Sequence, residues 1–307
     1  MLHLDTVVGV YLLGILLNTF LYGVVLAQFL TYFSTKSNDP LWMRVVVWSL
    51  LCTDTIHSAV EIYAAWEIGV VDFGNPARFA SVSWTIPFTA VATSVAAIIT
   101  QFFLAYRLWS LTKSKALVGI ICASSVLGLI FGCISGVMSG IIKEVAKFGS
   151  IVPFVVLWLS FQSLSDFLIT VSLITMLARW RTGFRRTDTI INRLIRGAIE
   201  TGTFASAFAL ADLFSFVFCR KTNLYAMFAF PIGRIYTNTL LHTLNGRASL
   251  RDMNSIIECD SEGNARAFQL QDRIQRHTMS NGGIKIVPVD SARSGDLEKT
   301  QRTWRDA

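Results

Sequence analysis

Residues 116–142 read ALVGIICASSVLGLIFGCISGVMSGII, an apolar segment without a single Asp, Glu, Lys or Arg. Residues 79–106 are likewise free of these four residue types. An apolar run longer than about 18 residues is typical of a helix that crosses a lipid bilayer. The whole chain of 307 residues is 53% hydrophobic and only 15% charged, whereas soluble domains carry about 25% charged residues. The sequence therefore predicts an integral, multi-pass membrane protein.

Five further long apolar segments accompany these two, which gives seven expected spans. They are residues 7–33, 43–68, 82–106, 116–142, 150–178, 194–218 and 223–245. Each exceeds the roughly 20 residues that a helix needs to cross about 30 Å of hydrocarbon. The first is too long for the apolar core of a secretory signal, so we expect it to be retained as a span. The predicted fold class is all-α, a seven-transmembrane-helix bundle.

The distribution of Lys and Arg predicts the orientation of the spans. Thirteen of these residues flank the spans on one side and five on the other. Because cytoplasmic loops carry the excess of positive charge, the N-terminus is expected outside and the C-terminus in the cytoplasm. The formal net charge of +7 is then explained by orientation, and we expect no nucleic acid partner. The expected location is the plasma membrane rather than an internal membrane.

The chain beyond the seventh span divides into two parts. Residues 247–259 place Leu250, Met253, Ile256 and Ile257 on one helical face, which fits an interfacial amphipathic helix. A frayed extension of span seven fits the same residues equally well. Residues 260–307 are polar and charged, and we interpret them as a disordered cytoplasmic tail.

Ionisable residues inside the spans mark the expected functional centre, because charged groups in a bilayer usually face the bundle interior and are paired. The candidates for a polar core or a ligand site are Asp54, His57, Glu61, Gln162, Asp166, Asp212, Arg234 and Asn238. In span two, Asp54, His57 and Glu61 follow one another at i, i+3 and i+7, so they share one face of the helix.

Depth along the spans predicts which of these residues meet. Asp54 lies about 16 Å along span two, and Arg234 lies at nearly the same depth in span seven. We therefore expect an Arg234–Asp54 ion pair with His57 beside it, and Asp166 or Asp212 as the fallback partner of Arg234. Such a pair fits a functional role and a purely structural role, in which it fixes helix register, equally well.

Several classes of seven-span protein are excluded or disfavoured by their missing residues. Span seven has no lysine for a retinal Schiff base, and its central cation is Arg234. Arg107 ends span three without the preceding acidic residue of rhodopsin-like receptors. The five cysteines show no paired spacing, so no metal site is indicated and no cofactor is expected. No nucleophile and base stand out together, so we do not expect an enzyme.

Four groups of residues together resemble a known family. They are Leu13-Gly14 with Tyr22-Gly23 and Gln28…Tyr32, Asp54-x-x-His57…Tyr63, Gln101-x-x-x-Ala105-Tyr106-Arg107-Leu-Trp109, and Arg234-x-Tyr236-x-Asn238 followed by Leu244-Asn245-x-Arg247. Over residues 10–250 the chain resembles fungal multi-span membrane proteins, abundant in mushroom-forming fungi, that share a domain of unknown function (DUF6534). The resemblance implies a seven-span fungal membrane protein and carries over no catalytic or ligand assignment.

These observations favour a receptor-like protein that senses a small or lipidic ligand between spans two, three, five, six and seven. Arg181, Arg185 and Arg186, in the expected inner loop 179–196, would meet a cytoplasmic signalling protein or anionic lipid. Two alternatives stay open. One is a proton-coupled carrier that uses Asp54, His57, Glu61 and Arg234, and the other is a structural or lipid-organising membrane protein.

Overall fold

The computed structural model describes residues 4–35, 39–73, 81–142, 145–179, 185–218 and 224–246, and these residues are folded into long helices. The helices are α1 (Leu4–Ser34), α2 (Leu41–Trp66), α3 (Thr85–Thr112), α4 (Lys115–Ile142), α5 (Val152–Arg179), α6 (Arg185–Phe218) and residues 224–246, named helix 224–246 below. A π-helical turn, η1 (Glu67–Val71), continues α2, and a 3₁₀ helix, η3 (Val145–Ser150), precedes α5. The expected interfacial helix 247–259, the expected tail 260–307 and Arg181 lie outside the described residues.

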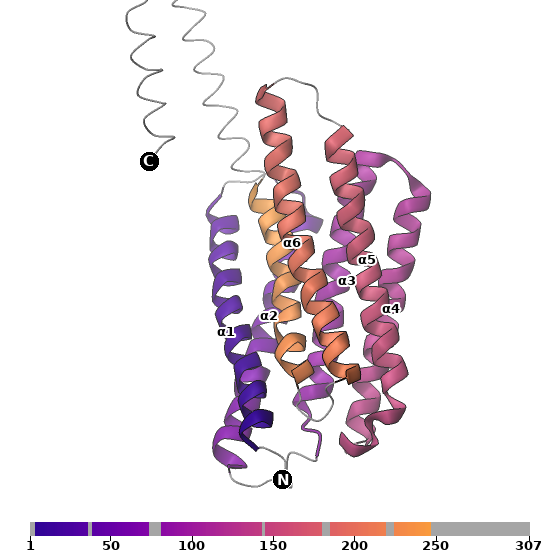
Figure 1. Ribbon diagram of the computed structural model, residues 1–307. Coiled ribbons are helices and arrows are strands. Elements are labelled where there is room, and N and C mark those ends of the chain that lie inside the picture. Colours follow the sequence, from indigo (N-terminus) through magenta and orange to yellow (C-terminus); the bar gives the residue numbers. More distant parts are fainter. Residues whose placement is uncertain are drawn as a thin grey trace, which may run out of the picture. The chain divides into compact units, whose positions relative to one another are not determined.

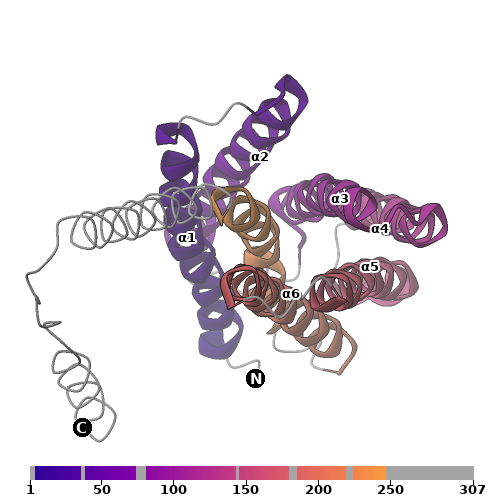
Figure 2. The same ribbon diagram turned by 90° about the horizontal axis from the view of Figure 1, so that it is seen from above.

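Neighbours in the chain are neighbours in the bundle, as short connections between antiparallel helices require. α1 packs on α2, α2 on α3, α3 on α4 and α5, α4 on α5, and α5 on α6. Helix 224–246 stands in the middle of this ring, between α1, α2, α3 and α6 (Figure 1, Figure 2). Its stretch from Phe230 to Thr237 is buried without interruption. The last helix is therefore the inner element of the bundle.

Six of the helices are long and apolar enough to cross a membrane, so the chain is a multi-span membrane protein. Their outer faces carry large apolar side chains such as Leu16, Phe20 and Leu30, each at least 66% exposed. Helix 224–246 is not among the six, because Arg234, Asn238 and His242 lower its hydropathy. The other helices bury Arg234, whereas Asn238 is half-buried and His242 is exposed. The seventh span and the direction of the bundle stay predictions.

Exposed aromatic residues gather at both ends of α2 and α3. At one end Trp42 packs against Tyr106, with ring centroids 4.9 Å apart, and at the other Tyr63 packs against Trp84 at 5.6 Å. Trp42 and Trp66, on the same helix, are separated by about 36 Å at 1.5 Å per residue. Two aromatic belts at that spacing match the two interfaces of a bilayer with a hydrocarbon core of about 30 Å.

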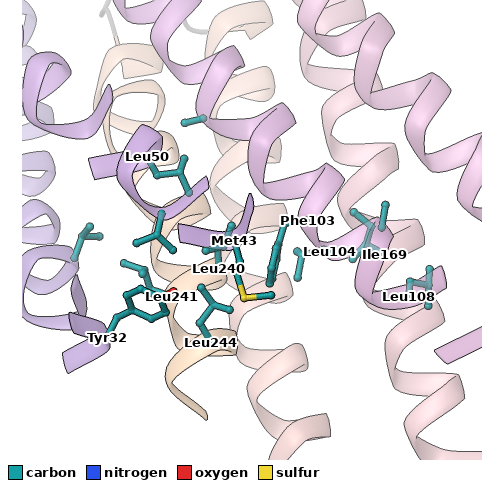
Figure 3. Close-up of a cluster of buried hydrophobic side chains, with 14 of the residues drawn as sticks. Tyr32, Met43, Leu50, Phe103, Leu104, Leu108, Ile169, Leu240, Leu241 and Leu244 are labelled. Atoms are coloured by element: carbon teal, nitrogen blue, oxygen red, sulfur yellow. The ribbon is translucent and has the colours of Figure 1, made fainter. Parts of the chain in front are cut away.

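The main apolar core fills the half of the bundle where α1, α3 and helix 224–246 end and α2 begins (Figure 3). Val25, Val47, Leu50, Leu108, Leu240 and Leu241 are all fully buried there. Burying one such side chain stabilises a fold by about 1.5–3 kcal/mol in water, and within a bilayer the same side chains contribute through close packing. This half is mainly apolar, and the cavity described below lies towards the other half.

Glycine allows α6 to approach α5 closely. A Cβ atom added at Gly202 would lie only 2.3 Å from Oγ1 of Thr170, well inside van der Waals contact. The same holds for α4 against α3, where a Cβ on Gly132 would lie 2.0 Å from Oγ of Ser94. Small residues at helix contacts are the usual device for close packing within membranes.

Two expected boundaries are corrected by the structure. The Arg-rich segment 179–196 was expected to be a loop, but α5 runs to Arg179 and α6 already begins at Arg185. Apolar residues at 190, 191, 194 and 195 recur at helical spacing there, and Ile195 packs against Leu177. Figure 1 shows the first turns of α6 projecting beyond the neighbouring end of α1. Hydropathy detects only the apolar part of a helix. It therefore missed the first turns of α6, which are rich in charged residues.

The third span was expected to end at residue 106, but α3 continues to Thr112. Lys113 then adopts a left-handed conformation with φ 54°, and its N–H donates to the carbonyl oxygen of Trp109. This is a common way to end a helix. Arg107 therefore lies within α3 and does not mark its end.

Candidate functional site

The inner face of α2 carries a row of polar side chains that are withdrawn from solvent. Asp54, His57, Ser58 and Glu61 are each at most 3% exposed. Their spacing of three or four residues places them on one side of the helix, as expected from the sequence. Nε2 of His57 lies 2.9 Å from Oε1 of Glu61, although the two atoms are not aligned for a hydrogen bond. His57 and Glu61 thus form a close acid–base pair.

Arg234 of helix 224–246 meets this row. Its Nη1 forms an ion pair with Oδ1 of Asp54, and its Nη2 donates to Oγ of Ser58 at 3.1 Å. The guanidinium group also lies over the ring of Tyr22, 5.7 Å from its centroid. Arg234 is only 1% exposed, and it is the largest of the fully buried side chains. The Arg234–Asp54 pair expected from depth is therefore confirmed.

Asp166 of α5 is held by a second buried network. Arg234 pairs with Asp54, so neither Asp166 nor Asp212 is needed as its fallback partner. Nε2 of Gln101 donates to Oδ1 of Asp166 at 2.8 Å, and the hydroxyl of Tyr236 donates to Oδ2 at 2.5 Å. Nε2 of Gln101 also reaches the backbone oxygen of Gln162 at 3.3 Å. These bonds join α3, α5 and helix 224–246. A buried carboxylate that accepts hydrogen bonds at both oxygens is well satisfied.

Asn238 joins helix 224–246 to α1. Its Oδ1 accepts a hydrogen bond from Nε2 of Gln28. Two helical turns further along, Nδ2 of Asn245 donates to the backbone oxygen of Gln28 at 3.0 Å. The candidate Asn238 therefore has a structural contact that accounts for its amide. The side chain of Gln162 is buried and lies beside the hydroxyl of Tyr236.

A cavity of about 90 Å³ lies near the ends of α4 and α6 and the beginnings of α3, α5 and helix 224–246. Apolar and aromatic side chains form most of its wall. The aromatic members are Tyr11, Phe148, Trp158, Phe216, Tyr225 and Phe230. Asp212 of α6 also lines the cavity, and it is 4% exposed. Mostly apolar concave sites with few polar groups are the usual form of a small-molecule site.

Asp212 differs from the other two buried aspartates in having no partner. It makes no hydrogen bond or ion pair with any residue of the described ranges. No other side chain with a formal charge at neutral pH belongs to the described wall of the cavity.

The structure thus divides these sequence candidates among three places. Asp54, His57, Glu61 and Arg234 come together in one cluster, and Asp166 lies in a separate network. Asp212 faces the cavity alone. The described wall of this cavity includes α1 and α4 but no residue of α2, so the cavity differs from the ligand pocket expected between spans two, three, five, six and seven, which stays a prediction.

Three contributors were not among the sequence candidates. Ser58 lies four residues after Asp54, so helical periodicity could have identified it as a neighbour. Gln101 and Tyr236 hold Asp166, and each is a polar residue inside an expected span. The side chains of Arg185 and Arg186 lie outside the described part of α6. Within the described ranges, no group of three or more His, Cys, Asp or Glu residues could hold a metal ion.

Comparison with known proteins gives a match only for the second half of the bundle. No curated protein and no solved structure matches the chain. Residues 162–249, which run from the middle of α5 through helix 224–246, match the family of unknown function DUF6534, and this confirms the family resemblance for that part of the chain.

Proposed function

We propose that the protein is receptor-like and senses a small ligand in the cavity inside its helix bundle. The observation that carries this proposal is the aromatic-lined cavity with Asp212 in its wall. The wall draws on α1, α3, α4, α5, α6 and helix 224–246. A ligand there would therefore touch six helices at once, and a change in their packing could reach the opposite end of the bundle.

Occupancy of the cavity should alter the far end of α5 and α6 if the protein is a sensor. The test is hydrogen exchange, measured by mass spectrometry, of the full chain in lipid nanodiscs with benzyl alcohol or benzylammonium chloride as probe. Binding of a probe should change exchange in residues 179–196. That segment joins α5 to α6 and holds Arg185 and Arg186, the proposed contact for a cytoplasmic signalling protein or anionic lipid.

A matched pair of variants separates the cavity from general membrane effects of the probes. Ala229→Leu adds three carbon atoms within the cavity wall and should abolish the exchange response. Ala123→Leu makes the same addition on an exposed face of α4 and should leave the response intact. A probe that binds wild type without changing exchange in residues 179–196 would contradict sensing.

The second candidate is a proton-coupled carrier, and the acid–base pair of His57 and Glu61 favours it. Both residues are 1% exposed and lie beside the Arg234–Asp54 pair. With Asp54, Glu61 and Arg234 ionised, the cluster carries one excess negative charge, which a proton on His57 or Glu61 would balance. Reconstituted protein should then move protons in liposomes that contain a pH-sensitive dye, and His57→Gln should stop the flux. Absence of flux in wild type would contradict this candidate.

A further inference from the structure

Three aspartates are buried among the described residues, and the bundle satisfies two of them itself. Asp54 is paired with Arg234, and Asp166 accepts hydrogen bonds from Gln101 and Tyr236. Asp212 has no such partner among the described residues, although it is 4% exposed. Burial of an ionised carboxylate costs a great deal of free energy unless an opposite charge or hydrogen-bond donors accompany it. Asp212 is therefore the one buried aspartate of the three for which the described residues supply no partner.

The wall next to Asp212 is rich in aromatic rings. Phe216 lies one helical turn after Asp212 on α6, and its ring packs edge to face against Tyr225 at 5.3 Å. Tyr11 and Phe230 form a second edge-to-face pair at 4.9 Å across α1 and helix 224–246. The electron-rich faces of aromatic rings attract cations, and rings grouped in this way favour organic ammonium ions.

We propose that the cavity binds a small organic ammonium ion, with its charged nitrogen at Asp212 and its apolar body against the aromatic wall. The proposal rests on the proposed function, since it assigns a ligand class to the same cavity. Asp212 would accept a charge-assisted hydrogen bond from the ammonium group, and the rings would contact its carbon atoms. The ligand then supplies the one partner that the described wall does not give Asp212.

Other ligand classes fit the cavity less well. A calcium or magnesium ion requires about six oxygen ligands, and Asp212 is the one carboxylate in the described wall. The hydroxyl groups of Ser135 and Ser139 already donate to backbone oxygens, at 2.8 Å and 2.7 Å. A neutral apolar ligand would fill the volume but would leave Asp212 unpaired. An organic cation meets the requirements of the carboxylate and of the rings together.

Two probes of equal size test the charge requirement directly. Benzylammonium and benzyl alcohol differ mainly in the ammonium and hydroxyl groups, and binding of each to the purified full chain can be followed by calorimetry at constant ionic strength. Wild type should bind benzylammonium about tenfold or more tightly than benzyl alcohol. Equal affinities, or binding of neither probe, would overturn the proposal.

Variants assign the preference to Asp212. Asp212→Asn removes the charge and should reduce the ratio of the two affinities to about one, whereas Asp212→Glu keeps the charge and should retain a preference for the ammonium ion. Asp166→Asn is the matched control, because it neutralises a buried aspartate outside the cavity, and it should keep the preference of wild type. A preference that survives Asp212→Asn in a folded protein would overturn the assignment.

The two proposals fail in distinguishable ways. If benzyl alcohol binds as tightly as benzylammonium and Ala229→Leu weakens both, the cavity is a ligand site for neutral molecules and only the ammonium assignment is wrong. If Ala229→Leu affects neither probe, the cavity is not the binding site and both proposals are wrong. If benzylammonium binds at Asp212 but exchange in residues 179–196 does not change, the ammonium assignment stands and the sensing role is wrong.

Discussion

The polar cluster on α2 and the cavity beside α6 both bury carboxylates, but they balance them differently. On α2, Asp54 lies against Arg234 and Glu61 lies beside His57, so each acid has a basic neighbour. On α6, Asp212 faces aromatic and aliphatic side chains and has no partner in the described ranges. The first region resembles an internal clamp between helices. The second is a mostly aromatic and aliphatic cavity with one carboxylate in its described wall, as in our proposed ligand site.

This difference indicates where the bundle is fixed and where it can respond. Paired buried charges hold two helices in one register, because a shift would separate them in a medium of low dielectric constant. An unpaired carboxylate makes no such demand on neighbouring helices. We expect it instead to favour a cationic ligand, which would supply the missing opposite charge.

Arg234→Leu should have the largest effect, because it leaves Asp54 buried without its cation. Removing one partner of a buried ion pair typically costs about 3–5 kcal/mol. We expect a large fall in the thermal unfolding temperature of the protein in detergent micelles. The double variant Arg234→Leu with Asp54→Asn should be more stable than either single variant, since no unpaired charge remains. Additive losses in this double-mutant cycle would show that the two residues do not interact.

Gly202→Ala should have a moderate effect, because the added methyl group would overlap Thr170 at the contact between α5 and α6. Overpacking of a close contact costs about 1–3 kcal/mol. Thr170→Ala removes the obstructing atoms, so it should restore much of the lost stability when combined with Gly202→Ala. Unfolding temperatures of the two single variants and the double variant check this. A harmless Gly202→Ala would mean that α6, and Asp212 with it, is held less closely than described.

Tyr236→Phe should have the smallest effect of the three, because it removes one of two hydrogen bonds to Asp166 and leaves the ring in place. Loss of a hydrogen bond to a charged group costs about 1.5–3 kcal/mol, and the bond that remains from Gln101 limits the loss to the lower part of that range. The unfolding temperature should fall accordingly, while the affinity for benzylammonium should not change. A change in that affinity would connect the Asp166 network to the cavity.

Much of the fold could be predicted from the sequence, because lipid imposes long apolar helices. The seven expected segments correspond to α1 to α6 and helix 224–246, and depth along two of them was sufficient to predict the Arg234–Asp54 pair. The first turns of α6 were missed, since charged residues there lower hydropathy without breaking a helix. Helix 224–246 shows the opposite limit: it is too polar to count as a span by hydropathy, and it is the most enclosed helix.

The cavity could not be predicted from the sequence. Asp212 was recognised as an intramembrane acid, but whether the described residues give it a partner depends on the packing of six helices around the cavity. Linear patterns report which face of a helix a residue occupies, not whether a neighbouring helix supplies a complementary group. The roles of Gln101 and Tyr236 at Asp166 were missed for the same reason.

The most direct test of this account compares the three buried aspartates under identical conditions. Asp54→Asn, Asp166→Asn and Asp212→Asn would each be purified as the full chain, and their unfolding temperatures measured without added ligand. We predict a large loss of stability for Asp54→Asn, a smaller loss for Asp166→Asn, and no loss or a gain for Asp212→Asn, because Asp212 alone of the three has no partner among the described residues. A loss at Asp212 as large as that at Asp54 would contradict it.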